Sequence, residues 1–247
     1  PDYTFPNGIP NPLIVENRPA TANAVISEGA DLGVAFDGDF DRCFFFDETG
    51  AFIGGEYVLS LLATSFLDKN PGSNIIHDPR VIWNVQDIVT RKGGRAIQSK
   101  TGHAFIKQAM RQTQAIYGGE MSAHHYFKDF AYCDSGMVPW LLIMELLSTT
   151  GMPLSKLVKE QFEAFPSSGE NNFTVENADA AIETVLQKYK PDALSIDETD
   201  GVSLAFDSWR FNLRKSNNEP LVRLNIEARG NAVDINQKLE DIKSLIT

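Results

Sequence analysis

The sequence has little cysteine and no long apolar run. Only two of its 247 residues are cysteines, Cys43 and Cys133, which excludes a disulfide-stabilised scaffold. Both lie among apolar neighbours, and this pattern predicts two buried, reduced thiols in a cytoplasmic protein. No cysteine–histidine cluster has the spacing of a zinc site. The longest apolar run, 137–147, contains Pro139 and Glu145 and is shorter than a membrane span of about 20 residues.

Positive charge is scarce as well. The chain has 22 lysine and arginine residues against 33 aspartate and glutamate residues, and its net charge is −11. Nucleic acids and anionic membranes attract basic surfaces, so we expect neither as a partner. Hydrophobic residues make up 43% of the chain and charged residues 22%, as in ordinary folded proteins. These values exclude a disordered tail, and they leave room for a local basic pocket that holds a phosphate.

The order of the predicted elements indicates three consecutive parts. Residues 1–51 begin with an irregular, proline-rich stretch and continue as a strand, an acidic loop and a second strand. Helices and strands alternate over 52–165, which predicts an α/β domain with a largely parallel sheet. A linker is expected at 165–169. Residues 166–247 show a strand, a helix, several strands and a last helix, which is typical of a small α+β domain.

Apolar spacing and turn residues place the individual elements. Helices are predicted at 57–67, 81–90, 105–112, 137–148, 154–162 and 180–189, with a last helix from Val233. Short strands are predicted at 31–36, 43–47, 74–77, 95–98, 115–117 and 173–175.

An acidic loop between the first two strands is the sharpest chemical signal. It has the sequence DGDFDR and carries Asp37, Asp39 and Asp41 at alternate positions. Three carboxylates in one tight turn repel one another unless a cation neutralises them, and hard oxygen ligands favour Mg²⁺ or Ca²⁺. The loop is therefore predicted to bind a divalent metal ion.

A basic loop near the end of the chain offers the donors that a phosphate requires. It has the sequence RKSNNEP over 214–220 and leads into a strand at 221–228 that carries Arg223. An arginine can donate two parallel hydrogen bonds to phosphate, and Lys215, the hydroxyl, the amides and the backbone N–H groups add further donors. Polar turns between strands are common, so this signal is weak by itself.

Three smaller segments also carry polar groups at the ends of predicted strands or at the start of a helix. The segment GGEMSAHH places Glu120 and Ser122 after two glycines, and a carboxylate beside a hydroxyl suits vicinal sugar hydroxyls. The segment KTGH ends at His103, where a helix begins. The segment DPR contains Arg80 and follows a strand.

Together these segments resemble one family, the α-D-phosphohexomutases, which includes phosphomannomutases and phosphoglucomutases. DGDFDR resembles the family's metal loop, GEMSAHH its sugar-binding loop and RKSNNEP its phosphate-binding loop. KTGH and Arg80 stand in the family's order, and the resemblance covers nearly the whole chain. The variants DGDFDR, IIHDPR and GEMSAHHYF are most similar to bacterial phosphomannomutases that supply GDP-mannose synthesis. The family fold implies an α/β chain with a mixed or parallel sheet, followed by a small α+β domain.

The resemblance implies roles for particular residues. Mg²⁺ would be held by the three aspartates, and a hexose 1,6-bisphosphate would serve as activator and intermediate. The sugar hydroxyls would be bound by Glu120 and Ser122. The distal phosphate of the hexose phosphate would be bound by Arg214, Ser216, Asn217, Asn218 and Arg223. The reacting end would be lined by Arg42, Arg80, His103 and His124, with His124 as the proton-transfer group.

The sequence also departs from the family pattern. Phe40 and Ala123 stand where the family commonly has glycine, and Asn218 stands where it has threonine. The phosphoserine motif T-A-S-H-N-P is not found in the sequence. We therefore expect a C-terminal fragment: 1–51 as the tail of domain 2, 52–165 as domain 3 and 166–247 as domain 4. Without the N-terminal domains of the same chain as partners, this fragment is expected to be inactive.

Two alternatives stay open on the sequence. A sister mutase that acts on glucose phosphate, or a bifunctional phosphohexomutase, shares the same loops. A non-catalytic sugar-phosphate-binding protein is possible because the phosphoserine motif is missing.

Overall fold

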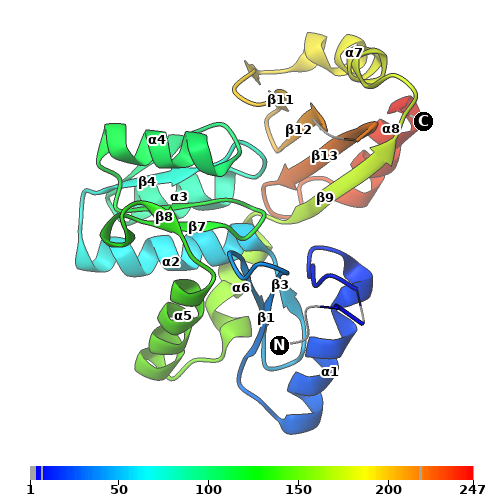
Figure 1. The fold of residues 1–247 in the computed structure, drawn as a ribbon. Helices are drawn as coiled ribbons and strands as arrows, with labels where there is room; N and C mark the ends of the chain where they lie inside the picture. Colours follow the sequence, from blue (N-terminus) through cyan, green and yellow to red (C-terminus); the bar gives the residue numbers. More distant parts are fainter. Residues whose placement is uncertain (1–3, 7, 217–218, 247) are drawn as a thin grey trace.

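The computed structural model describes residues 4–6, 8–216 and 219–246, and its strands form three sheets (Figure 1). The first sheet is antiparallel, with the order β1-β2-β3. Its strands are β1 (Gly33–Phe36), β2 (Cys43–Phe46) and β3 (Phe52–Ile53). A short 3-10 helix η1 (Val15–Asn17) and helix α1 (Pro19–Glu28) precede them. Helix α1 was not predicted, although its first residue is a proline whose fixed φ suits a first helical turn.

The second sheet has the order β5-β4-β6-β7-β8. Its strands are β4 (Asn74–His77), β5 (Arg95–Gln98), β6 (Tyr117–Gly119), β7 (His125–Phe127) and β8 (Cys133–Asp134), and η2 (Lys128–Phe130) lies between the last two. The first three strands in this order run parallel, whereas β7 and β8 pair antiparallel. The sheet is therefore mixed rather than largely parallel, because the strand after the GEMSAHH turn runs back along β6.

Helices cover both faces of the second sheet. They are α2 (Gly55–Lys69), α3 (Trp83–Arg91), α4 (His103–Thr113), α5 (Met137–Thr150) and α6 (Leu154–Ala164). One core cluster joins α2, α3, α5 and α6 to the sheet, and a second joins α4 to the opposite face. No single helix in the described ranges is long and apolar enough to cross a membrane, and α5 and α6 reach that length only as a pair bent by 102°.

The first sheet shares its core with the second. Cys43, Phe45 and Ile53 belong to the same buried cluster as Leu62 and Ile75. Residues 1–51 therefore pack as part of this core and do not form a separate one. Both cysteines are free thiols, as predicted, but only Cys43 is buried. Cys133 is half-buried because it lies on β8 at the edge of the sheet.

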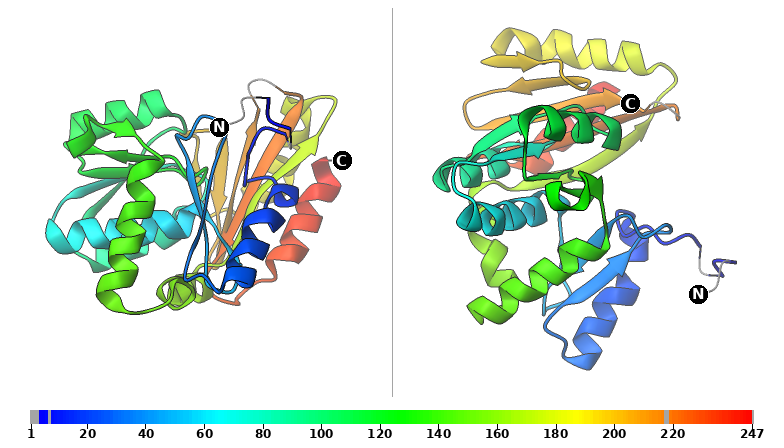
Figure 2. Two further views of the ribbon diagram at one scale, coloured as in Figure 1. Left: turned by 60° about the horizontal axis from the view of Figure 1, so that its bottom comes forward. Right: turned by 60° about the vertical axis from the view of Figure 1, so that its left-hand side comes forward.

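The third sheet is antiparallel and has the order β10-β11-β12-β13-β9. Its strands are β9 (Ser167–Thr174), β10 (Ser195–Asp197), β11 (Val202–Ala205), β12 (Trp209–Lys215) and β13 (Leu221–Ala228). Helices α7 (Ala178–Tyr189) and α8 (Ile235–Ile246) share its apolar core, and η3 (Lys190–Asp192) follows α7. Figure 2 shows this sheet and its helices as a layer beside the second sheet. The linker predicted at 165–169 is wrong over 167–169, where β9 begins by pairing with β13.

Candidate active site

The acidic loop joins β1 to β2 and brings its three aspartates together. Oxygens of Asp37, Asp39 and Asp41 lie within 4.8 Å of one another. Asp37 is buried, and it accepts hydrogen bonds from the backbone N–H and the Nε of Arg42 at 3.2 and 2.7 Å. Oδ1 of Asp41 is buried and has no hydrogen-bond partner among the described residues. Three carboxylates, one of which has a buried oxygen that accepts no hydrogen bond, are a donor set that fits Mg²⁺.

The predicted sugar-binding loop GEMSAHH (119–125), here called the sugar loop, begins at the end of β6 and faces the acidic loop. Glu120 is buried, and its Oε2 lies 3.1 Å from Nδ1 of His124 and 3.2 Å from Oγ of Ser122. Nε2 of His124 lies 3.2 Å from Oδ2 of Asp41. His124 thus connects the sugar loop to Asp41 of the acidic loop, 83 residues away in the sequence.

The two adjacent histidines have different environments. Burial lowers the pKa of His124, but the hydrogen bond and charge of Glu120 and the charge of Asp41 outweigh burial and hold this pKa above its usual range. Burial lowers the pKa of His125 to about 3, and its Nδ1 lies 2.7 Å from the hydroxyl of Tyr117 in the core. Of these two histidines, only His124 is therefore placed to hold a proton at the site.

Arg80 is enclosed in a network of carboxylates. Its guanidinium donates to Asp78 at 2.5 and 2.9 Å and to the hydroxyl of Ser122 at 3.2 Å. Asp78 also accepts the backbone N–H of Met121 at 2.9 Å. Burial raises the pKa of Asp78, but the charge and hydrogen bonds of Arg80 outweigh it and keep this pKa below its usual range. The segment DPR is thereby joined to the sugar loop.

His103 lies at the start of α4 and is exposed. The preceding residue, Gly102, donates its backbone N–H to Oε1 of Glu120 at 2.5 Å, so the KTGH segment also meets the sugar loop. Arg42 takes part in the acidic loop itself, because its Nη2 lies 2.6 Å from Asp37 and its Nε 3.5 Å from Asp41.

The basic end of the site lies on the third sheet. Arg214 at the end of β12 is the cross-strand partner of Arg223 on β13. An Nη of Arg223 lies 3.4 Å from the hydroxyl of Ser216. Lys215 does not join them, because alternate residues of a strand face opposite ways, and it pairs with Asp179 at 2.9 Å. The predicted ligands Asn217 and Asn218 lie outside the described residues.

Two residues of the site were missed on the sequence. Glu170 on β9 contacts Arg80, Arg214 and Arg223, and Asp78 holds Arg80. Glu170 falls in a segment that begins inside the predicted linker, so no pattern pointed to it. Asp78 directly follows a predicted strand, and this position was a signal that could have identified it.

Both residues that replace a family glycine adopt a backbone conformation that favours glycine. The φ angle is +63° at Phe40 and +69° at Ala123. A side chain in this left-handed region costs about 1 kcal/mol or more. The acidic and sugar loops therefore keep a glycine-like turn despite the substitutions.

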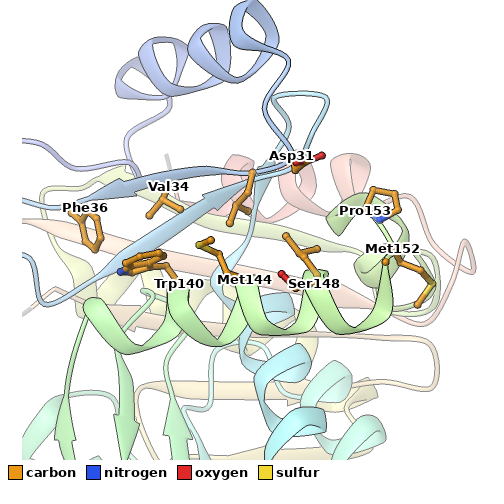
Figure 3. Close-up of a pocket in the computed structure, with 11 residues that line it drawn as sticks. Asp31, Val34, Phe36, Trp140, Met144, Ser148, Met152 and Pro153 are labelled. Atoms are coloured by element: carbon orange, nitrogen blue, oxygen red, sulfur yellow. The ribbon is translucent and has the colours of Figure 1, made fainter.

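A separate apolar groove lies between β1 and α5 and has a volume of about 850 Å³. Figure 3 shows Val34 and Phe36 of β1 facing Trp140 and Met144 of α5 across it. None of the predicted site residues lines this groove. The groove is therefore separate from the predicted site residues.

Three models of one family match consecutive parts of the chain. They describe phosphoglucomutase/phosphomannomutase alpha/beta/alpha domain II, alpha/beta/alpha domain III and C-terminal domain, and they match residues 1–50, 54–165 and 170–244. Together they cover nearly the whole sequence.

Individual relatives agree with these matches. Over 93% of this chain, the sequence is 61% identical to an Escherichia coli K12 phosphomannomutase. Over the whole of this chain, it is 55% identical to a Xanthomonas campestris protein named phosphohexose mutases. It spans about half the length of these curated relatives. A crystal structure of a phosphoglucomutase/phosphomannomutase family protein from Burkholderia thailandensis matches with a TM-score of 0.84 at 31% identity. That match covers 99% of this chain and 52% of the other.

Proposed function

The chain belongs to the phosphoglucomutase/phosphomannomutase family, and from this we propose that it forms part of a phosphomannomutase that interconverts mannose 6-phosphate and mannose 1-phosphate. The observation that carries the proposal is the meeting of the loops. On one side, Glu120 and His124 connect the sugar loop to Asp41 of the acidic loop. On the other side, Arg80 connects the sugar loop to Glu170. Glu170 in turn pairs with Arg214 and Arg223. One continuous network therefore joins the predicted metal site to the predicted phosphate site.

The proposed reaction uses a phosphoserine supplied by another domain of the complete protein. The phosphoryl group passes from the serine oxygen to a hydroxyl of the hexose phosphate, and the proton of that hydroxyl returns to the serine through His124. The hexose 1,6-bisphosphate then returns its other phosphoryl group to the serine oxygen, and the serine proton passes to the sugar oxygen that loses this group. Mg²⁺, held by Asp37, Asp39 and Asp41, would neutralise charge at the phosphoryl group when bound.

The remaining groups bind and orient the sugar phosphate. Glu120 and Ser122 would accept and donate hydrogen bonds to sugar hydroxyls, and Arg214 and Arg223 would hold the distal phosphate. Burial raises the pKa of Glu120, but the hydrogen bond of His124 and the charge of Arg80 hold it below its usual range, so Glu120 is an acceptor. His103 at the start of α4 would face the reacting end.

Mannose phosphate is proposed as substrate because several relatives at 57–61% identity bear the name phosphomannomutase. Within the same proposal, the product supplies GDP-mannose synthesis in the cytoplasm. A coupled assay with mannose 1-phosphate and glucose 1-phosphate tests the substrate. It requires a longer protein that contains this chain and a phosphoserine domain.

We expect turnover of mannose 1-phosphate by the longer protein, and none by this chain alone even with glucose 1,6-bisphosphate present. Turnover by the chain alone would contradict the assignment of the phosphoryl carrier to another domain. A longer protein that binds hexose phosphate without turning it over would be a non-catalytic binding protein. Preference for glucose 1-phosphate would identify the sister activity.

A further inference from the structure

Glu170 is the one carboxylate shared by three arginines of the site, as far as the described residues show. Its Oε2 lies 2.9 Å from Nη2 of Arg214 and 3.4 Å from Nη1 of Arg80, and its Oε1 lies 3.3 Å from Nη1 of Arg223. The side chain is 20% exposed. Every hydrogen bond and ion pair described for this carboxylate is with an arginine guanidinium. Attraction to these positive charges therefore holds the Glu170 side chain in place.

The surroundings explain why an anion is needed there. Arg214 and Arg223 are directly opposite each other on β12 and β13, and like charges in that position repel. Their other acidic neighbours are more distant, with Asp200 at 4.0 Å and Glu219 at 3.6 Å. Arg80 already has Asp78 as a close partner. Glu170 is therefore the main counter-charge of the opposed pair Arg214–Arg223.

The two arginines still have donors to offer. The Nε atoms of Arg214 and Arg223 are buried, and neither has a hydrogen-bond partner within the described ranges. Buried N–H groups without a partner are costly, and they mark a place where an acceptor is missing. Glu170 satisfies only part of the hydrogen-bonding capacity of this pair.

We propose that Glu170 is an internal stand-in for the substrate phosphate and sets how tightly this site holds a phosphate. The proposal rests on the proposed function, because it takes Arg214 and Arg223 as the phosphate-binding groups. An incoming phosphate needs the same guanidinium donors, so it displaces the Glu170 carboxylate or binds beside it at the expense of repulsion between anions. In both cases the native carboxylate weakens phosphate binding.

Weak holding suits the proposed reaction. A hexose 1,6-bisphosphate must present first one phosphate and then the other to the same serine, so each phosphate has to leave the arginines in every cycle. A carboxylate that takes over the arginines as phosphate leaves lowers the barrier to that exchange. The competing interpretation is that Glu170 only orders the arginines for binding. The two interpretations predict opposite signs when the charge is removed.

Glu170→Gln tests the sign, since it removes the charge and keeps the shape. Inorganic phosphate is titrated into the purified chain by calorimetry at constant ionic strength. We expect binding to tighten by about 5- to 30-fold, because relief of a repulsion of about 1–2 kcal/mol corresponds to that factor. A role in ordering the arginines alone would weaken binding instead.

Glu219→Gln is the matched control. This variant also removes one negative charge beside Arg223. Glu219 is 59% exposed and lies 3.6 Å from Arg223, so its replacement should change the affinity for phosphate by less than about twofold. Equal tightening by both variants would reveal a general effect of net charge and overturn the proposal. Unchanged or weaker binding by Glu170→Gln would also overturn it, while phosphate binding by the parent chain would leave the proposed function standing.

Two further outcomes are decisive. Should neither the parent chain nor Glu170→Gln bind phosphate, both this proposal and the assignment of the phosphate loop fail. Glu170→Ala is measured in parallel, with circular dichroism to verify folding. Failure of both variants to fold would show that Glu170 is needed for the structure, which contradicts a role limited to affinity.

Discussion

Strands β12 and β13 carry two cross-strand pairs that contain arginine, four residues apart, and the pairs differ in what the arginine faces. At one end Arg210 is the cross-strand partner of Glu227, and at the other Arg214 is the partner of Arg223. The first pair is closed: Arg210 is 2% exposed, Glu227 is 0% exposed, and Nη1 of Arg210 lies 2.6 Å from Oε1 of Glu227. The second pair, Arg214–Arg223, is open: it is partly exposed, and it keeps donors without partners among the described residues.

The closed pair holds the third sheet to the second. Arg210 donates to the backbone carbonyls of Pro79 and Arg80 at 2.9 and 3.0 Å. Glu227 accepts the backbone N–H groups of Ile82 and Trp83 at the start of α3, at 2.7 and 2.9 Å. All of these contacts lie around the segment that carries Arg80, so the closed pair positions part of the site.

The difference shows how one pair of strands can serve both structure and binding. Where each charge has an internal partner, the group joins two layers of the protein. Where two like charges face each other, the pair needs an anion, and Glu170 satisfies only some of the donors of Arg214 and Arg223. Breaking either pair should therefore have a different consequence.

Arg210→Met is expected to have the largest effect on stability. It leaves Glu227 as a buried charge without its cation, and loss of one partner of a buried pair costs about 3–5 kcal/mol. The free energy of unfolding in urea measures this loss. Arg214→Met, on the same strand, should cost about 1 kcal/mol or less, because Arg214 is partly exposed and opposes another arginine. Equal losses in the two variants would contradict the distinction between the closed and open pairs.

Glu56 extends the comparison, since it is buried at the start of α2 and forms no ion pair with any described residue. Burial raises its pKa from 4.5 to about 7, and the charges of Asp78 and Glu227 add to the rise, against a hydrogen bond from Ser167. A carboxyl group with a higher pKa in the folded state takes up protons on folding. The contribution of Glu56 to stability should therefore fall as pH rises from about 4.5 to about 7 and stay level above that range.

Glu56→Gln should remove this pH dependence. The parent chain is expected to lose about 2–4 kcal/mol relative to Glu56→Gln across the interval, since one pKa unit corresponds to about 1.4 kcal/mol. Urea unfolding of both proteins between about pH 5 and about pH 8 measures the difference, in which the other acidic groups cancel. Parallel curves for the two proteins would show that Glu56 titrates normally.

Arg214→Ala tests the open pair through binding. It should weaken hexose phosphate binding by about tenfold to a hundredfold, because charge-assisted hydrogen bonds contribute about 1.5–3 kcal/mol. Asp39→Ala should instead abolish Mg²⁺ binding and leave hexose phosphate affinity nearly unchanged. Calorimetry with mannose 1-phosphate and with Mg²⁺ separates the two effects. If Arg214→Ala binds mannose 1-phosphate as tightly as the parent chain, these arginines do not form the phosphate site.

Local pattern predicted much of the scaffold and the loops. The strand, acidic loop and strand around Asp37, and the helices that became α2 and α4, lie within a few residues of their predicted positions. Each depends on spacing between near neighbours, such as alternation in a strand or apolar residues every three or four positions in a helix. The family resemblance is carried by segments of the same short range.

Long-range contacts were not predictable in the same way. Glu170 lies on a strand of small and polar residues, SSGENNFT, which is held mainly by pairing with β13 and has no apolar pattern of its own. The Arg210–Glu227 pair depends on the register of two strands and on a third segment some 130 residues away. Helix α1 was hidden by the prolines around it, although Pro19 suits its first turn.

The smallest expected effect concerns backbone strain, which separates the loops of the site from the third sheet. The non-glycine residues with positive φ include Phe40 and Ala123, and none is found among the described residues of 166–246. Phe40 is 60% exposed, so its ring contributes little to the core. Glycine adopts a φ of +63° without strain, whereas alanine keeps the strain and loses the ring. Phe40→Gly should therefore be more stable to urea than Phe40→Ala by about 1 kcal/mol, because a side chain in the left-handed region costs about that much. Equal stability of the two variants would show that the acidic loop relaxes to a negative φ at position 40 and that its turn does not depend on a glycine-like conformation.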